Sequence, residues 1–338
     1  MAAFDVPDLV SVNYEDKSWI NQTTDVVQGL LTSCSAWVVV TVWLFQQRNA
    51  SRIMNRLLEV DVRLSGLSKL RPNNKKMLVC LAVHLMITPF LWITIWVIEH
   101  RKTPLLPNDL VNLCFFYTPS FVIHWFILEY SVAMGMVANE LGRVNECLSN
   151  LREFSNYLSS SPLLFNNHLE ASSLSNYAQL VALRSFHGIR TMLFEISKDV
   201  ADFFSFPMLL CIAHSFVTMV HQVYYLSIPA IIPNQPFSLS ETIFGTIWLF
   251  IIVSPIISLF VNVTETVKKA KLTGQIVHTL LVTAMRSEIK SQLEQFSLQL
   301  LHEEFNFTAY GFFTLDFTLL HTMMGTTASY LFILIQFR

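Results

Sequence analysis

Charged residues gather in some stretches of the chain and leave others uncharged. Six stretches contain no Asp, Glu, Lys or Arg and approach or exceed the roughly 20 residues that a helix needs to cross about 30 Å of hydrocarbon. Because a helix at the surface of a soluble protein keeps a charged face, these stretches predict membrane-spanning helices. They are residues 26–45, 77–98, 110–128, 203–232, 242–264 and 317–337.

The distribution of Lys and Arg predicts how the spans are oriented, because cytoplasmic connections carry an excess of both. Seventeen of them lie in residues 46–76, 139–190 and 263–307. The connections on the opposite side hold only Lys17, Arg101, Lys102 and Arg338. Both chain ends are therefore expected outside the cell, where Asn21 of the sequence Asn-Gln-Thr is a candidate for N-glycosylation.

The spans and their connections divide the chain into alternating segments. Apolar residues recur at helical spacing between the charges of the inner connections, which predicts helices that extend into the cytosol and pack there. The expected fold is an all-α, polytopic membrane bundle of six transmembrane helices with long cytosolic extensions. Its boundaries are an extracellular tail over 1–25, spans over 26–45, 77–98, 110–134, 203–232 and 242–264, extracellular loops over 99–109 and 233–241, cytoplasmic segments over 46–76, 135–202 and 265–316, and a last span over 317–338.

Composition favours a membrane protein and gives no sign of an enzyme. The 338 residues are 53% hydrophobic and 14% charged, whereas soluble domains carry about 25% charged residues. The sequence has no GxSxG, HExxH or phosphate-binding loop motif, and its five cysteines form no CxxC pair. His214 and His221 share a helix face, but two imidazoles without a third ligand make a poor metal site. No catalytic residue, metal, cofactor or nucleic-acid partner is expected.

The end of the chain carries a pattern that resembles a known family. It reads Ser329-Tyr330, five hydrophobic residues, then Gln336-Phe337. This resembles the signature of insect gustatory receptors, in which Thr-Tyr, five hydrophobic residues and Gln-Phe end the final helix. Ser329 stands where the family usually has Thr and keeps the hydroxyl group. The family has seven helices and a cytoplasmic N-terminus, so the chain is expected to lack the first helix of that pattern.

The resemblance implies a ligand-gated, nonselective cation channel. Four subunits would surround a central pore with their last helices, while the cytosolic extensions form an anchoring assembly. Gln336, Phe337 and Ile333 are then the expected gate, because an apolar ring can close a pore by dewetting and an amide can contact a hydrated ion. The alternative for Gln336 is an interfacial polar residue. Asp316 is expected either to attract cations at the inner mouth or to cap the last helix, and Tyr330 to pack against neighbouring helices.

The expected ligand is a small-molecule tastant, either a sugar or a bitter compound, bound in the outer halves of the spans before the last. Aromatic faces with a few hydrogen-bonding groups suit such a ligand, although the same residues would also form an interfacial aromatic belt. The candidates are Trp92, Trp96, Tyr117, His221, Gln222, Tyr225, Thr246 and Trp248.

The expected partners are membrane lipid and other gustatory receptor subunits, in a homotetramer or heterotetramer of the plasma membrane of gustatory sensory neurons. The alternatives are a silent or regulatory subunit, a G-protein-coupled receptor and a transporter. A transporter that couples its substrate to protons needs charged residues at the centre of the membrane, and the predicted spans contain no such charges. This favours a channel over a transporter.

Overall fold

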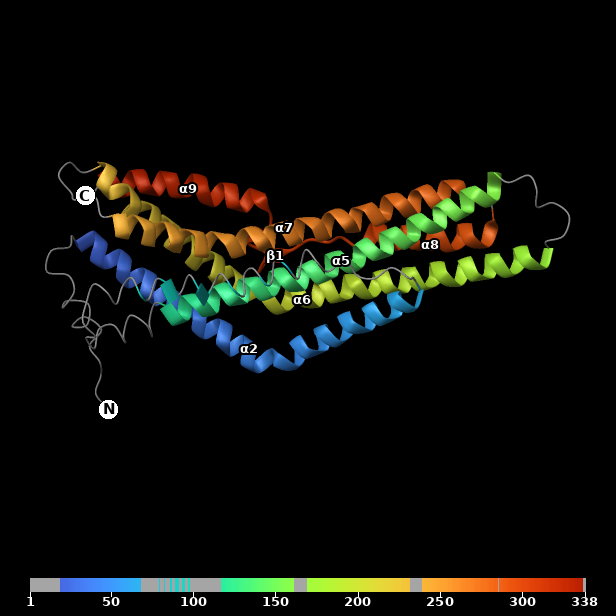
Figure 1. Cartoon of the computed structure of the whole chain (residues 1–338), viewed down its shortest axis with the longest axis horizontal. Helices are drawn as coiled ribbons and strands as arrows, with labels where there is room; N and C mark the ends of the chain where they lie inside the picture. Colours follow the sequence, from blue (N-terminus) through green and yellow to red (C-terminus); the bar gives the residue numbers. More distant parts are fainter. Residues whose placement is uncertain are drawn as a thin grey trace.

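Long helices make up nearly all of the part of the chain that the computed structural model describes (Figure 1). The structure describes residues 19–67, scattered positions between 79 and 97, and residues 117–160, 169–231, 239–284 and 286–336. The helices are α2 (Trp19–Leu67), α5 (Thr118–Ser160), α6 (Leu169–Ile231), α7 (Leu239–Thr283), α8 (Ser287–His302) and α9 (Phe317–Gln336). Two short strands, β1 (Thr308–Ala309) and β2 (Phe313–Thr314), pair as an antiparallel hairpin between α8 and α9.

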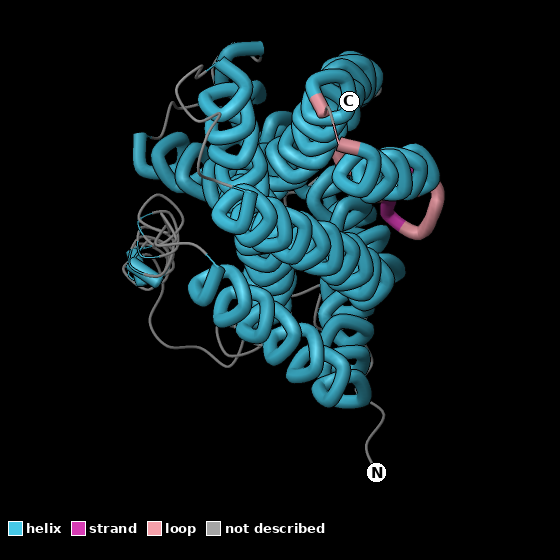
Figure 2. Tube along the Cα trace, turned by 90° about the vertical axis from the view of Figure 1, so that its right-hand side faces the viewer, coloured by secondary structure: helices cyan, strands magenta, loops and turns pink. Residues whose placement is uncertain are grey.

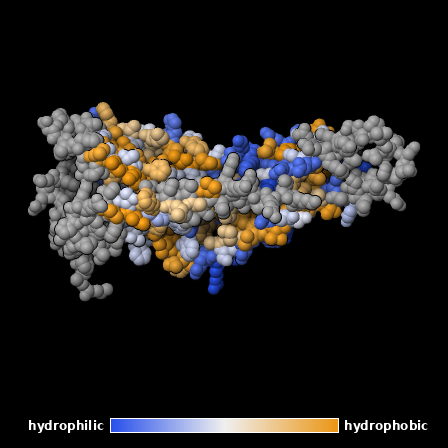
Figure 3. All heavy atoms as spheres, viewed as in Figure 1, coloured by the Kyte–Doolittle hydropathy of each residue, from blue (hydrophilic) through white to orange (hydrophobic). Residues whose placement is uncertain are grey.

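The long helices continue without a break from the expected membrane spans into the segments expected to lie in the cytosol. The 45 residues of α7 extend about 68 Å at 1.5 Å per residue, which is more than twice the hydrocarbon thickness of a bilayer. Among the described residues, α2, α5, α6 and α7 each contain a window apolar enough to cross a membrane. Apolar side chains predominate on the half of the molecule that contains α9, and hydrophilic ones gather toward the middle (Figure 3). The expected all-α membrane bundle is therefore confirmed.

The helices pack as one bundle, with the hairpin on its side (Figure 2). Pairs α5 and α7, and α2 and α6, lie against each other over long distances. The buried core includes the stacked rings of Tyr130 on α5 and Phe204 on α6, whose centroids lie 4.6 Å apart. A large apolar core thus runs along the bundle, and a smaller cluster surrounds Trp248.

Ion pairs fix the inner half of α2 to its neighbours. Arg56 binds Glu195 and Asp199 on α6, at 2.5 and 2.6 Å. Farther along, the buried Arg143 of α5 binds Asp61 of α2 and Glu140 of its own helix. Burial raises the pKa of Glu140, whereas the attraction of Arg143 lowers it. Charged residues of the connections expected to be cytoplasmic therefore join α2 to α5 and α6.

Some expected boundaries differ from those of the structure. Helix α2 begins at Trp19, so Asn21 lies in its first turn, within the part of the chain expected to be an extracellular tail. In the segment expected over 265–316, α7 ends at Thr283 and a separate helix, α8, runs from Ser287 to His302. The span expected over 77–98 falls outside the described residues, apart from scattered positions.

Candidate functional site

Polar side chains lie buried in the core between the outer parts of α2, α5 and α6. The hydroxyl group of Thr32 lies 3.1 Å from Nδ1 of His214, whose ring centroid is 6.4 Å from that of His124. Nδ1 of His124 contacts the carbonyl oxygen of Ser120 at 2.5 Å. Polar groups buried at membrane depth are costly and often serve function. Thr32 and His124 were not predicted from the sequence, although each is a polar residue within an otherwise apolar span.

Aromatic residues from α7 and from the position just before α5 are in contact with each other. The ring of Tyr117 lies edge-on to the indole of Trp248, with centroids 5.5 Å apart, and Phe244 stacks on the same indole at 6.2 Å. Trp248 is buried. Two of the eight ligand candidates, from segments 131 residues apart, are therefore in direct contact.

A second group of candidates lies on α6 where it approaches α7. The rings of His221 and Tyr225, one helical turn apart, lie 4.6 Å from each other. A Cβ atom at Gly245 of α7 would come within 2.9 Å of a Leu226 methyl carbon and 3.5 Å of the Gln222 amide oxygen. The glycine therefore allows the two helices to approach closely beside Gln222.

The remaining candidates are not brought into these groups. Thr246 is exposed, and its hydroxyl group donates a hydrogen bond to the carbonyl oxygen of Thr242 within its own helix. Trp92 and Trp96 lie outside the described residues. Four of the candidates that the structure describes thus form two aromatic contacts. Tyr117 contacts Trp248 of α7, and His221 contacts Tyr225 along α6.

Helix α9 has two unlike faces. Met323 and Thr327 are buried on one face. The opposite face is exposed and carries small or polar residues spaced by three, four or seven positions, so they lie in one line along the helix. This hydroxyl stripe consists of Thr318, Thr322, Gly325, Ser329 and Gln336. Such a face is better suited to water than to lipid. The stripe was not among the features predicted from the sequence, although its spacing is helical.

The predicted gate and packing residues lie around this stripe. Gln336 is its last member, Ile333 flanks it and is 44% exposed, and Phe337 lies outside the described residues. The hydroxyl group of Ser329 donates to the Gly325 carbonyl oxygen. Tyr330 lies toward α6, with its ring edge-on to Phe216 at 6.2 Å, as a packing residue would.

Asp316 caps the N-terminus of α9. Its Oδ1 accepts hydrogen bonds from the backbone N–H groups of Thr318 and Leu319, at 2.9 and 3.3 Å. The N–H of Leu319 also donates to the backbone carbonyl oxygen of Asp316, at 3.2 Å, so the side chain matters most for the N–H of Thr318 at the helix start. The capping role expected from the sequence is therefore present, and a role in attracting cations stays a prediction.

We expect Asp316→Asn to separate these two roles, because an asparagine oxygen can still cap while the charge is lost. Asp316→Ala should lower stability by about 1 kcal/mol, and Asp316→Asn by much less. Thermal unfolding of the purified variants measures this difference. If the carboxylate also attracts cations, Asp316→Asn should reduce single-channel conductance without changing stability; an unchanged conductance would leave only the cap.

The base of α9 is attached to α6 through the hairpin and α8. The backbone N–H of Tyr310 donates to the hydroxyl group of Ser205, and the ring of Tyr310 lies edge-on to Phe206 at 5.5 Å. Tyr310 and Gly311 both have positive φ angles, 51° and 77°, which form the tight turn of the hairpin. Movement of α6 at this level would therefore act directly on the chain leading into α9.

A buried ion pair strengthens the same attachment. Arg190 of α6 donates to Glu303 at the end of α8, and its guanidinium group lies over the rings of Phe305 and Phe194 at 4.7 and 5.7 Å. Only 2% of the Arg190 side chain is exposed. Burial lowers the pKa of Arg190, and the attraction of Glu303 partly offsets this. The pair thus fixes α8 on α6.

Comparisons with known proteins agree with this architecture. The family model described as 7tm Chemosensory receptor matches residues 3–338. Gustatory receptor 28b of Drosophila melanogaster is 33% identical over 153 residues, 44% of this chain and 33% of the relative. Gustatory receptor for bitter taste 66a of the same species is 30% identical over 185 residues, 52% of this chain and 34% of the relative. The matches thus cover about a third of these relatives' length.

A solved structure has the same fold. The insect olfactory receptor OR5 from Machilis hrabei superposes with a TM-score of 0.67 at 14% identity, covering 98% of this chain and 85% of that one. Its complex with eugenol superposes with a TM-score of 0.55. Family model, relatives and fold lead to one assignment. The chain is a membrane protein that belongs to the 7tm chemosensory receptor family.

Proposed function

We propose that the chain is a gustatory receptor subunit that forms a ligand-gated, nonselective cation channel, with α9 lining the pore. The observation that carries this proposal is the exposed hydroxyl stripe on α9, opposite a buried face that packs on the bundle. Hydroxyl and amide oxygens can contact hydrated cations as they pass. One helix cannot enclose a pore, so several copies, four by the family resemblance, would surround it.

The proposed ligand is a small-molecule tastant that binds in the outer bundle. Tyr117, Trp248, His221 and Tyr225 supply aromatic faces there, and Gln222 supplies an amide. Pockets of this composition suit small ligands with a few polar groups. A ligand that favours one spacing of α6 and α7 would shift α6, and the hairpin and Arg190 would pass that shift to α9. The proposed location is the plasma membrane of gustatory neurons.

Cysteine accessibility tests whether the stripe faces the pore. We expect Thr322→Cys and Ser329→Cys to react with a charged, membrane-impermeant methanethiosulfonate reagent and to lose most of the ligand-evoked current. Met324→Cys is the matched control, because Met324 is 62% exposed on the same helix but off the stripe. Whole-cell current in expressing cells, tested with sugars and bitter compounds, is the measurement.

Two results would contradict the proposal. The first is equal block at Met324 and at the stripe positions, which would show that the stripe has no special access to water. The second is well-folded surface protein that passes no current with any tested ligand, also when expressed with other gustatory receptor subunits. That second result would favour a silent or regulatory subunit.

A further inference from the structure

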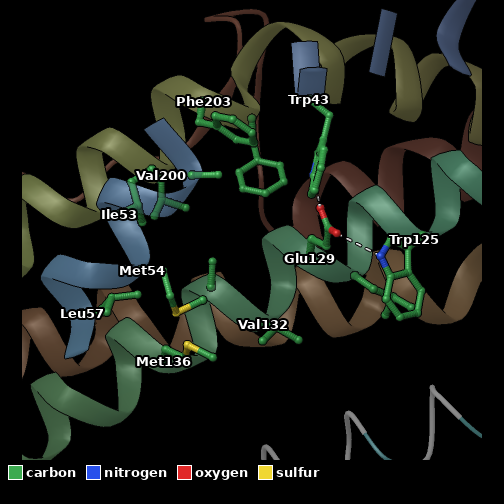
Figure 4. A pocket seen from close by; sticks show the side chains of 14 residues that line it. Trp43, Ile53, Met54, Leu57, Trp125, Glu129, Val132, Met136, Val200 and Phe203 are labelled. Atoms are coloured by element: carbon green, nitrogen blue, oxygen red, sulfur yellow. Dashed lines mark hydrogen bonds between the residues drawn. The ribbon is translucent and has the colours of Figure 1, made fainter. Parts of the chain in front are cut away.

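A groove on the flank of the bundle, between α2, α5 and α6, contains an acidic side chain among apolar ones (Figure 4). Its volume is about 270 Å³. Its lining includes Trp43, Met54, Trp125, Glu129, Met136 and Phe203. We call it the Glu129 groove. It lies away from the outer aromatic contacts and from α9, so the proposed function does not use it.

The carboxylate of Glu129 is held by two neutral donors. Nε1 of Trp43 donates to Oε2 at 3.1 Å, and Nε1 of Trp125 donates to Oε1 at 2.9 Å. In Figure 4 the two indoles flank the carboxylate from different helices. Among the described residues, no Lys, Arg or His forms an ion pair with Glu129. The two hydrogen bonds orient the carboxylate but leave its negative charge uncompensated.

The depth of the groove makes this charge unusual. Trp43 lies near the inner end of the first uncharged stretch, Glu129 directly follows the third, and Phe203 begins the fourth. A charge at the edge of the hydrocarbon layer is costly to keep without a partner. Three helices line the groove, and two indole hydrogen bonds hold the carboxylate in a fixed orientation. A carboxylate held in this way is suited to bind a cation.

We propose that the Glu129 groove binds a small hydrophobic amine in its protonated form. The ammonium group would pair with the carboxylate and lie against indole faces, which attract cations. The apolar body would contact the aliphatic and thioether side chains of the groove, and methionine adapts to varied shapes. An apolar cavity of about 150 Å³ can hold benzene, so about 270 Å³ accommodates one ring with a short chain and not a diacyl lipid.

Equilibrium binding to the full chain in phosphatidylcholine nanodiscs tests the proposal. The probes are radiolabelled 4-phenylbutylamine and its uncharged analogue 4-phenylbutan-1-ol. We expect saturable amine binding that Glu129→Gln weakens at least tenfold, with alcohol binding unchanged. Glu265→Gln is the matched control, because Glu265 is a partly exposed carboxylate on α7 outside the groove and should leave amine binding as in the wild type.

A second variant keeps the test informative if Glu129→Gln fails to fold. Met54 is 45% exposed at the groove, so Met54→Trp should fill the space without disturbing the core and should abolish amine binding while Glu129 stays intact. Equal amine affinity in wild type and Glu129→Gln would overturn the proposal. Equal affinity for amine and alcohol would do so too, since recognition would not depend on charge. Loss of amine binding in phosphatidylethanolamine nanodiscs would instead assign the site to a lipid headgroup.

Discussion

Arg190→Ala should destabilise the receptor by about 3–5 kcal/mol, among the largest effects expected of a single substitution in this chain. The change removes the cation from a site where only 2% of the Arg190 side chain and 11% of the Glu303 side chain are exposed. Glu303 keeps a hydrogen bond from the Gln299 amide but loses the charge that balances its own. The stacking on Phe305 is lost as well. Thermal unfolding of purified receptor in detergent measures the result.

Arg184→Ala is the control for this prediction. Arg184 lies on the same helix but is exposed and makes one hydrogen bond, to Gln292, at 3.2 Å. Its loss should change stability by less than about 0.5 kcal/mol. Arg190→Lys should fall between the two alanine variants, because lysine keeps the charge but not the planar group that stacks on the rings. Equal midpoints for Arg190→Ala and Arg184→Ala would contradict a stabilising role for the buried pair.

The all-α membrane fold could be predicted from the sequence because the signal of a membrane-spanning helix is local. A long run without charges can be stable only in lipid or in a large core, and the segregation of Lys and Arg applies over whole connections. The cap at Asp316 was also foreseen, since an acidic residue immediately before an apolar helix is a local pattern. The stripe from Thr318 to Gln336 has a helical period and was available to the same reasoning.

Contacts between distant segments could not be predicted in this way. Arg190 and Glu303 are separated by 113 positions, and Trp43 and Glu129 by 86. Many other charged residues of the inner connections are equally suitable partners by type alone. Which charged residues pair depends on how each helix is rotated about its axis and shifted along it in the bundle. A hydrophobic pattern in the sequence specifies neither quantity. The hairpin before α9 was missed for a related reason, since two-residue strands carry too few positions for a period.

Arg143→Ala is the second substitution expected to have a large effect. Arg143 joins α2 to α5, because Nη1 binds both Asp61 and Glu140 while Nη2 donates to Ser65. Only 5% of the Arg143 side chain and 8% of the Glu140 side chain are exposed. Removing the arginine leaves the Glu140 carboxylate buried without its cation, which should cost about 3–5 kcal/mol at neutral pH. Asp61 is 41% exposed, so water can compensate it.

The cost of Arg143→Ala should depend on pH in a defined direction. Burial already raises the pKa of Glu140, and Arg143 opposes that rise. Without Arg143 the folded-state pKa rises further above its unfolded value, so the folded variant gains stability from protonation as the pH falls through that raised pKa. The destabilisation should therefore be full at pH 7.5 and smaller at pH 5. Thermal unfolding of wild type and variant at both values gives the comparison.

The double variant Arg143→Ala/Glu140→Gln identifies Glu140 as the origin of this dependence. Glutamine has nearly the same shape as glutamate but no charge to bury, so part of the stability lost at pH 7.5 should return and the difference between the two pH values should shrink. If the double variant kept the full pH dependence, Asp61 would be the group responsible. If it were no more stable than Arg143→Ala, lost packing between α2 and α5, and not an uncompensated charge, would account for the effect.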